Sequence, residues 1–475
     1  MKVLYAVSEA RPFAASGGLA DVAGSLPQAL RKRLIGCRVV MPLYESVPKE
    51  LRDKMKFITH IIVPVAWRSQ YCGIYEAKHG GVIYYLLDNQ YYFKRDNYYA
   101  YYDDAERFAF FSRAVLEILP HIGFFPDVIH CNDWQTALTP VYQTCIYSQR
   151  EEYQHIKTLF TIHNIQYQGV YGREILHDVL GLSDEHYSLL EYDGAINLMK
   201  GGIECANMVT TVSPTYAKEI LDPWYSHGLD SILVQREWKL KGILNGIDTE
   251  YYNPETDTEI AANYSALSPE NKKLCKAALQ KEMGLPETED TPLIGIVSRL
   301  VGHKGFDLVK AVLEEILEKE NVQLAVLGSG EGQYEGFFKE MHEKYPEKLG
   351  VYIGFNPALA KRIYAGADIF LMPSKSEPCG LAQMVALRYG TVPIVRATGG
   401  LKDSIFDNKG GDGNGFVFEN YNAEELKETI YRALQLYKDQ KEWRALRTRA
   451  FESDCSWGKS ANEYIKVYKQ VIKQV

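Results

Sequence analysis

The chain has 475 residues, and at about 150 residues per domain this length predicts more than one domain. Apolar residues make up 46% and charged residues 24%, which is typical of a globular protein. The net charge of −8 argues against the basic face that nucleic acids require. No apolar run approaches the roughly 18 residues of a membrane span. Neither nucleic acid nor a membrane is therefore expected as a partner.

Tyrosine is unusually abundant, with 34 residues against 18 Phe and 6 Trp. Ten of them crowd into one short stretch: Tyr71, Tyr75, Tyr84, Tyr85, Tyr91, Tyr92, Tyr98, Tyr99, Tyr101 and Tyr102. Tyrosine combines a flat ring with a hydrogen-bonding tip. The cluster fits either strands with their hydroxyls in water or a platform for a hydroxyl-rich ligand.

The eight cysteines are scattered, and none forms a C-x-x-C pair. This spacing predicts neither a disulfide framework nor a zinc site, and it favours a reducing cytoplasm. The apolar stretch that begins at Val3 ends before Glu9. It is too short for a secretory leader and predicts a first buried strand.

In the N-terminal half, short apolar runs alternate with polar loops and helical periods, which is typical of β-α units around a parallel sheet. The predicted strands are residues 3–7, 38–41, 127–131, 159–162 and 208–212. The predicted helices cover residues 19–33 and begin again near residue 135.

The same alternation restarts after residue 248. Helices are predicted at residues 269–283 and 306–318, and a helical tail from residue 461. The strands are predicted at residues 293–297, 323–327, 351–353, 369–372 and 392–395. The sequence thus predicts an α/β protein with two doubly wound halves that meet near residue 242. Such sheets bind ligands beyond the carboxyl ends of their strands, so the cleft between the halves is the first place to expect a site.

Several loops after strands carry polar residues that could do chemistry. Ser16-Gly17-Gly18 could present backbone N–H groups to an anion, or could be a tight turn. Arg299 and Lys304 flank a loop before a helix N-terminus, where two cations suit a phosphate unless the loop is simply solvated.

Three further strand ends carry Asp133, His163 and Glu377. Asp133 and Glu377 could cap the helices that follow them, and His163 could be a structural hydrogen-bonding group. The functional interpretation of Glu377 is a carboxylate aimed at sugar hydroxyls, and an Asp, a His and a Glu at three strand ends favour a function. Taken alone, these patterns predict a two-domain α/β enzyme that handles a phosphorylated ligand.

Ordered motifs over the whole length resemble the family of bacterial glycogen synthases and plant starch synthases. The motifs are residues 16–22, 130–134, 161–164, 167–169, 211–216, 242–248, 297–300 with 304–305, 377–381 and 398–401. The resemblance implies a GT-B fold, in which two Rossmann-like domains face a deep cleft. It also implies transfer of glucose from ADP-glucose to the non-reducing end of an α-1,4-glucan, with retention of configuration.

The resemblance assigns residues 1–241 to the acceptor-side domain, rejoined by a C-terminal helix at 460–475, and residues 242–459 to the donor-side domain. It implies the partners ADP-glucose and glycogen, no cofactor and no metal. The catalytic residues carried over are Glu377, His163, Asp133, Arg299 and Lys304. The donor-binding residues carried over are Ser16, Gly17, Gly18, Asn245, Arg299, Lys304, Phe355, Cys379, Gly380 and Leu381. Phe355 would stack on the adenine.

The sequence departs from the family pattern in its first and donor loops. Ala15 replaces a family lysine, and Lys375-Ser376 replaces Arg-Phe, which loses a bidentate guanidinium. Val385 occupies the position where the wider GT-B group has a second carboxylate. A front-face transfer, in which the departing phosphate accepts the acceptor's proton, therefore fits better than a carboxylate nucleophile.

Alternatives remain open beside this interpretation. They are a GT-B glucosyltransferase that uses UDP-glucose or a small acceptor, and a catalytically silent glucan-binding paralogue suggested by Ala15. A nicotinamide-dependent oxidoreductase is suggested by Gly328-Ser-Gly330-Glu-Gly332, although the spacing is not the full fingerprint. Within the tyrosine cluster, Tyr98 and Tyr101 are the predicted glucan-binding residues.

Overall fold

The computed structural model describes residues 1–474, and the chain divides into two compact units. Unit 1 comprises residues 1–245 together with the C-terminal segment from Trp457, and unit 2 comprises residues 246–456. The predicted bounds at 241 and 460 are each a few residues off. The strand β12 (Leu240–Gly242) pairs with β11 of unit 1, and the last helix already begins at Trp457.

Unit 1 is built on a nine-stranded sheet with the order β12-β11-β7-β6-β1-β2-β5-β4-β3. Its strands besides β12 are β1 (Lys2–Ala6), β2 (Gly36–Pro42), β3 (Lys56–Val65), β4 (Arg68–His79), β5 (Val82–Asp88), β6 (Val128–Asn132), β7 (Lys157–Ile162) and β11 (Met208–Thr211). Strands β12 to β5 in this order run parallel, whereas β4 and β3 pair antiparallel at one edge. A three-stranded antiparallel sheet stands apart and consists of β8 (Val170–Tyr171), β9 (Glu191–Tyr192) and β10 (Ala195–Asn197).

Helices pack on both faces of the large sheet. The longer ones are α1 (Gly18–Lys32), α4 (Asp104–Glu117), α6 (Leu138–Tyr142), α9 (Leu198–Cys205), α10 (Pro214–Glu219), α11 (Asp230–Gln235) and α20 (Trp457–Ile472). Single-turn helices are α2 (Lys49–Arg52), α3 (Gln90–Phe93), α5 (Leu119–Ile122), α7 (Ile175–Asp178) and α8 (Tyr187–Leu190). No helix in residues 1–474 is both long and apolar enough to cross a membrane.

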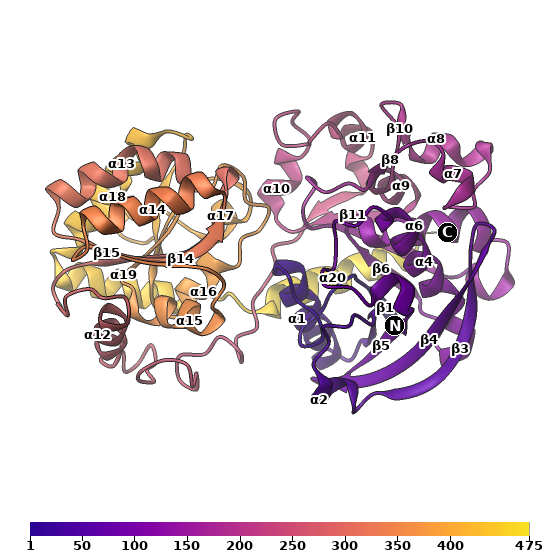
Figure 1. Ribbon diagram of the computed structural model, residues 1–475, viewed down its shortest axis with the longest axis horizontal. Helices are drawn as coiled ribbons and strands as arrows, with labels where there is room; N and C mark the ends of the chain where they lie inside the picture. The colour runs from indigo at the N-terminus through magenta and orange to yellow at the C-terminus, as the bar shows by residue number, and fades with distance from the viewer. Residues whose placement is uncertain (475) are drawn as a thin grey trace. The chain divides into compact units, whose positions relative to one another are not determined.

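Helix α20 returns from the end of the chain to unit 1, where Figure 1 shows it in yellow among indigo and purple elements. Its indole Trp457 Nε1 donates to Ser25 Oγ of α1 at 2.7 Å. The Tyr468 hydroxyl lies 2.7 Å from Nδ1 of the buried His130 in β6. These buried contacts explain why the C-terminal segment belongs to the N-terminal fold.

Unit 2 has a six-stranded, fully parallel sheet with the order β15-β14-β13-β16-β17-β18. Its strands are β13 (Leu293–Leu300), β14 (Gln323–Gly330), β15 (Leu349–Ile353), β16 (Ile369–Met372), β17 (Val392–Arg396) and β18 (Phe416–Phe418). Its helices are α12 (Lys272–Glu282), α13 (Phe306–Lys319), α14 (Gly332–Lys344), α15 (Pro357–Gly366), α16 (Ala382–Arg388), α17 (Gly399–Ser404), α18 (Ala423–Tyr437) and α19 (Gln440–Glu452). Helix α12 begins three residues after the predicted Pro269.

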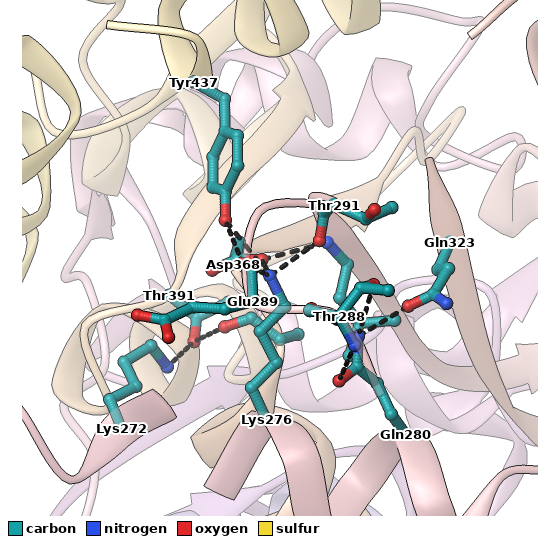
Figure 2. A network of polar contacts seen from close by, with 12 residues as sticks. Lys272, Lys276, Gln280, Thr288, Glu289, Thr291, Gln323, Asp368, Thr391 and Tyr437 are labelled. Atoms are coloured by element: carbon teal, nitrogen blue, oxygen red, sulfur yellow. Dashed lines mark hydrogen bonds and ion pairs between the residues drawn. The ribbon is translucent and has the colours of Figure 1, made fainter. Parts of the chain in front are cut away.

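A network of buried polar contacts joins α12 to the amino ends of the unit 2 strands (Figure 2). Lys276 Nζ pairs with Asp368 at 2.8 Å and donates to the carbonyls of Glu289 and Thr291 and to the Tyr437 hydroxyl. One turn further along α12, Gln280 bonds Gln323 at 2.7 Å.

Two of the three glycines that suggested a nicotinamide fingerprint, Gly328 and Gly330, lie at the end of β14, and the third, Gly332, begins α14. A Cβ at Gly328 would approach the Ser298 carbonyl to 2.2 Å, and one at Gly330 would approach the Leu300 carbonyl to 2.3 Å. Glycine is therefore required there for the close pairing of β14 with β13. Strand pairing thus accounts for Gly328 and Gly330.

Candidate functional site

Each large sheet has one point where the strand order reverses. In unit 1, the chain proceeds outward from β1 through β2 to β5 on one side, and from β6 through β7 to β11 on the other. In unit 2 the adjacent strands β13 and β16 divide the sheet in the same way. Ligands of open parallel sheets bind beyond the carboxyl ends of the strands at such a point. The predicted residues can therefore be examined at two separate strand ends.

At the unit 2 strand ends, the loops after β13 and β16 bring Lys304 and Glu377 together. Lys304 Nζ lies 2.6 Å from Glu377 Oε2, and the Ser374 hydroxyl donates to the same oxygen at 3.0 Å. Glu377 is buried and Lys304 is partly buried. Glu377 is the one protein acceptor for Lys304 Nζ among the described residues, so two of its three N–H donors are unused. Unused donors beside a carboxylate can bind both an anion and a hydroxyl.

The backbones of the loops after β13 and β16 are in close contact. Gly305 has φ +82°, and a Cβ there would meet the Pro373 carbonyl oxygen at 2.0 Å. The Lys375 N–H donates to the His303 carbonyl at 2.9 Å. Glycine is therefore required after Lys304. It lets the two loop backbones come close together, and this places Lys304 beside Glu377.

Two side chains donate hydrogen bonds to backbone carbonyls of the Glu377 loop. Sequence reasoning did not identify either of them. Arg396, at the end of β17, donates to the Ser374 carbonyl at 2.9 Å and to the Lys375 carbonyl. The fully buried Gln383 of α16 donates to the carbonyls of Cys379 and Gly380 at 3.1 and 2.9 Å. Neither residue carries a sequence pattern that marks it, because each acts on backbone atoms that only the fold brings near.

The remaining unit 2 predictions fall around the same loops. Arg299 is exposed at the end of β13, and Leu381 immediately precedes α16. Phe355 follows β15, and 85% of its surface is exposed, which leaves its ring faces accessible. Between Arg299 and Lys304, burial and the two neighbouring cations lower the pKa of His303 to about 4, so its ring is neutral at pH 7.

At the unit 1 strand ends, Asp133 follows β6 and His163 follows β7. Asp133 Oδ1 accepts a hydrogen bond from the His163 backbone N–H at 2.7 Å, and a longer one from Asn164. Burial raises the pKa of Asp133 to about 7, although these two N–H donors oppose that rise. Burial also lowers the pKa of His163 to about 3. The structure therefore brings two of the predicted catalytic residues into direct contact.

Asp133 also has an unusual backbone conformation, with φ 55° and ψ −179°. This region is populated almost solely by glycine and costs about 1–3 kcal/mol for other residues. Strain of this kind clusters at functional sites, where the surrounding structure maintains it. It turns the chain at the end of β6 so that the Asp133 carboxylate faces the end of β7.

The glycine loop before α1 is exposed at Ser16, Gly17 and Gly18. No side chain caps the helix at Gly17, which leaves its first N–H groups unpaired by a cap. The Ser16 N–H donates to Glu9 Oε2 at 2.5 Å, and burial raises the pKa of Glu9 to about 7. Glu9, which sequence reasoning did not identify, thus fixes the start of this loop.

Asn245 and the two predicted tyrosines are the other assignments in unit 1. Asn245 is buried, and its Oδ1 has no hydrogen-bond partner among residues 1–474. The Tyr98 hydroxyl accepts from Ser46 at 2.9 Å, and the Tyr101 ring lies 4.8–4.9 Å from the guanidinium groups of Arg95 and Arg107.

The exposed rings of the tyrosine cluster are Tyr71, Tyr91 and Tyr102, whereas Tyr98 and Tyr101 are partly buried. The role of Tyr98 and Tyr101 in binding a glucan stays a prediction.

Solved structures with this fold are known. The catalytic domain of starch synthase IV from Arabidopsis thaliana, bound to ADP and acarbose, aligns with a TM-score of 0.92 at 33% identity, covering 100% of this chain and 99% of that chain. Sucrose-phosphate synthase from Thermosynechococcus elongatus aligns with a TM-score of 0.62 at 16% identity over 100% of both chains, which is a likeness of fold alone. The fold and its paired strand-end sites define a GT-B glycosyltransferase.

Sequence comparisons narrow this class. Residues 2–235 match the family model of the starch synthase catalytic domain, and residues 280–448 match that of glycosyl transferases group 1. Glycogen synthase from Geobacillus thermodenitrificans is 52% identical over 100% of this chain and 98% of its own length. Glycogen synthase from Bacillus cereus ATCC 10987 is 51% identical over the full length of both chains. The chain belongs to the glycogen and starch synthase family.

Proposed function

We propose that this enzyme transfers glucose from ADP-glucose to the non-reducing end of an α-1,4-glucan such as glycogen, with retention of configuration. The observation that carries the proposal is the Lys304–Glu377 pair beside Arg299 at the reversal point of the unit 2 sheet. It is supported by membership of the family and by the ADP and acarbose bound to the related starch synthase IV.

Arg299 and Lys304 would bind the diphosphate and offset the negative charge that develops as it leaves. Glu377 would accept hydrogen bonds from hydroxyls of the transferred glucose, on a loop that continues through Cys379, Gly380 and Leu381. The exposed ring of Phe355 would stack on the adenine, because stacking needs only a free aromatic face. Two further groups would contact the nucleotide sugar. The unpartnered Oδ1 of Asn245 would accept a hydrogen bond from it, and the N–H groups after Gly17 would donate to it.

The transfer step would proceed on one face of the sugar. The bond between the anomeric carbon and the phosphate oxygen breaks, and the acceptor hydroxyl oxygen forms the new glycosidic bond. The proton of that hydroxyl passes to the departing phosphate. Val385, the position at which a second carboxylate would stand, is buried inside α16. The family resemblance supports a role for His163 and Asp133 in the same reaction.

We also propose that the reaction needs no metal or other cofactor, because two cationic side chains can neutralise the diphosphate. Addition of EDTA should then leave the turnover number unchanged. The free thiols of all eight cysteines suit a reducing compartment and support a cytoplasmic location.

The test is incorporation of labelled glucose into glycogen from ADP-glucose and, in parallel, from UDP-glucose. The proposal expects polymer labelling with ADP-glucose at a clearly higher kcat/KM. A preference for UDP-glucose would overturn the proposed donor. It would also indicate that the residues that differ from the family pattern, Ala15 and Lys375-Ser376, determine which nucleotide sugar is used. Absence of labelling with both donors, together with absence of ADP release from ADP-glucose and of UDP release from UDP-glucose, would indicate a silent glucan-binding paralogue.

A further inference from the structure

The side chain of Asn132, the last residue of β6, forms hydrogen bonds in the fully buried interior of unit 1. Its Nδ2 donates to the carbonyl oxygens of Ala6 at 2.9 Å and His130 at 3.2 Å. Both partners can only accept, so the orientation of the amide is fixed with Nδ2 on this side. The Oδ1 atom must therefore face the opposite way and can only accept.

Two groups approach that oxygen. The hydroxyl of the fully buried Tyr5 donates to Asn132 Oδ1 at 2.9 Å, and His163 Nε2 lies 2.8 Å from the same atom. Since Oδ1 has no proton to give, His163 Nε2 must carry the hydrogen. The alternative neutral tautomer would set a lone pair against the Asn132 oxygen.

We propose that Asn132 is a positioning residue that fixes His163 as the neutral Nε2–H tautomer and so presents the bare Nδ1 atom as a hydrogen-bond acceptor for a sugar hydroxyl. The identity of the ligand, a sugar hydroxyl, rests on the proposed function. The tautomer of His163 does not depend on it. No described residue bonds Nδ1, and His163 retains some exposed surface, so Nδ1 is the ring nitrogen left for a ligand.

The groups around His163 support a neutral ring. Its backbone N–H is bound by Asp133 Oδ1 at 2.7 Å, so that carboxylate faces the main chain rather than the ring. The nearest other titratable ring is His130, whose two nitrogens lie 2.7 Å from Tyr468 and 2.6 Å from Thr161. Burial of His163 acts in the same direction, because it lowers the pKa of the imidazolium to about 3.

The test is ¹⁵N NMR of the full-length protein labelled at histidine, at neutral pH. The signal of His163 is assigned by its loss in His163→Gln. We expect a pyrrole-type shift at Nε2 and a pyridine-type shift at Nδ1. His342 provides an internal reference of the opposite kind, because its Nδ1 lies 2.6 Å from the Leu349 carbonyl and must donate to it.

Two variants separate positioning from general packing. Asn132→Leu should abolish the single Nε2–H pattern and lower kcat at least tenfold, since the ring then loses its fixed acceptor. Tyr5→Phe retains Asn132 and should keep the Nε2–H pattern. A pyrrole-type Nδ1 or an imidazolium in the wild-type protein would overturn the inference even if Asn132→Leu failed to fold. So would an Asn132→Leu protein with an unchanged spectrum and kcat.

The two proposals fail in different ways. If the tautomer is as expected but no donor yields labelled glucan, the proposed function fails and the positioning by Asn132 stands. If glucan is labelled and the wild-type tautomer is Nδ1–H, the positioning fails and the proposed function stands.

Discussion

The sheet of unit 2 carries a lysine–carboxylate pair at each end, and the two pairs differ in what else their atoms contact. At the amino end, Lys276 pairs with Asp368 and also reaches two carbonyls and the Tyr437 hydroxyl. At the carboxyl end, Lys304 pairs with Glu377 and has no further protein acceptor among residues 1–474. The first pair has its bonding capacity satisfied inside the fold, whereas the second retains donors that a ligand can use.

This difference separates a structural pair from a binding pair when the residue types are the same. Both pairs have distances below 3 Å, and both are largely shielded from solvent. Neither the residue types nor the burial distinguishes them. The unused hydrogen-bond donors do, together with the location at the carboxyl ends where open parallel sheets bind ligands.

The largest expected effect is on stability, at the amino end. Lys276→Met removes the ion-pair partner of the partly buried Asp368 and the donor to two backbone carbonyls, and breaking a buried pair costs about 3–5 kcal/mol. The free energy of unfolding from urea denaturation checks it. The matched control is Lys273→Met on the same helix, where the side chain is 57% exposed and its ion pair is worth about 0–1 kcal/mol. An equal loss of unfolding free energy in both variants would show that Lys276 stabilises the fold no more than an exposed lysine does.

The next effect is on catalysis, at the carboxyl end. Lys304→Met should lower kcat by about 10²–10³, because the charge on the departing diphosphate loses a cation. Because the buried Glu377 also loses its cation, kcat is measured per folded molecule, at a temperature where the variant stays folded. Lys319→Met, at the exposed far end of α13, is the control and should transfer glucose normally. Wild-type kcat in the Lys304 variant would refute the role given to this lysine.

A smaller effect is expected from the support behind the Glu377 loop. Gln383→Leu removes the donors that bind the carbonyls of Cys379 and Gly380. We expect kcat/KM for the nucleotide sugar to fall about tenfold, or about 1.4 kcal/mol. Ser404→Ala removes a neighbouring partner of the same amide and should cost less. A Gln383 variant that unfolds without any change in kinetics per folded molecule would make this residue purely structural.

The smallest effect concerns the acceptor. Replacing Tyr98 and Tyr101 together by Ala should raise the KM for glycogen a few-fold and leave the KM for the nucleotide sugar unchanged. Both hydroxyls have partners within the fold, so the same measurement on Tyr91 and Tyr102 compares partly buried rings with exposed ones. An unchanged glycogen KM in the first variant would remove the predicted acceptor role.

The sequence predicts the central strands well because they are buried on both faces and form continuous apolar runs, as in residues 293–297 and 369–372. The adjacent strands β3, β4 and β5 were missed. In the edge strand β3, exposed apolar residues such as Phe57 and Ile62 break a simple alternation, whereas β5 was missed although it is largely buried. The start of α12 was misplaced because Pro269 precedes the first helical turn rather than opening it.

The site was predicted as far as its residues belong to local motifs. Glu377, Lys304, His163 and Asp133 each follow a strand, and the order of the strands then determines their neighbours. Asn132, Gln383 and Arg396 could not be assigned, because their partners are backbone carbonyls that the folded loops bring to them. The burial of Lys276 was equally hidden, since a lysine on an amphipathic helix is ordinarily exposed.

The measurement that tests the central claim most directly is ADP binding by calorimetry to Lys304→Met and Lys276→Met, at a temperature where both remain folded. The structure predicts that Lys304→Met binds ADP at least tenfold more weakly than the wild type. Lys276→Met should bind ADP with wild-type affinity despite its lower stability. Wild-type affinity in the Lys304 variant, or an equal loss in both, would contradict the assignment of the carboxyl-end pair to the ligand.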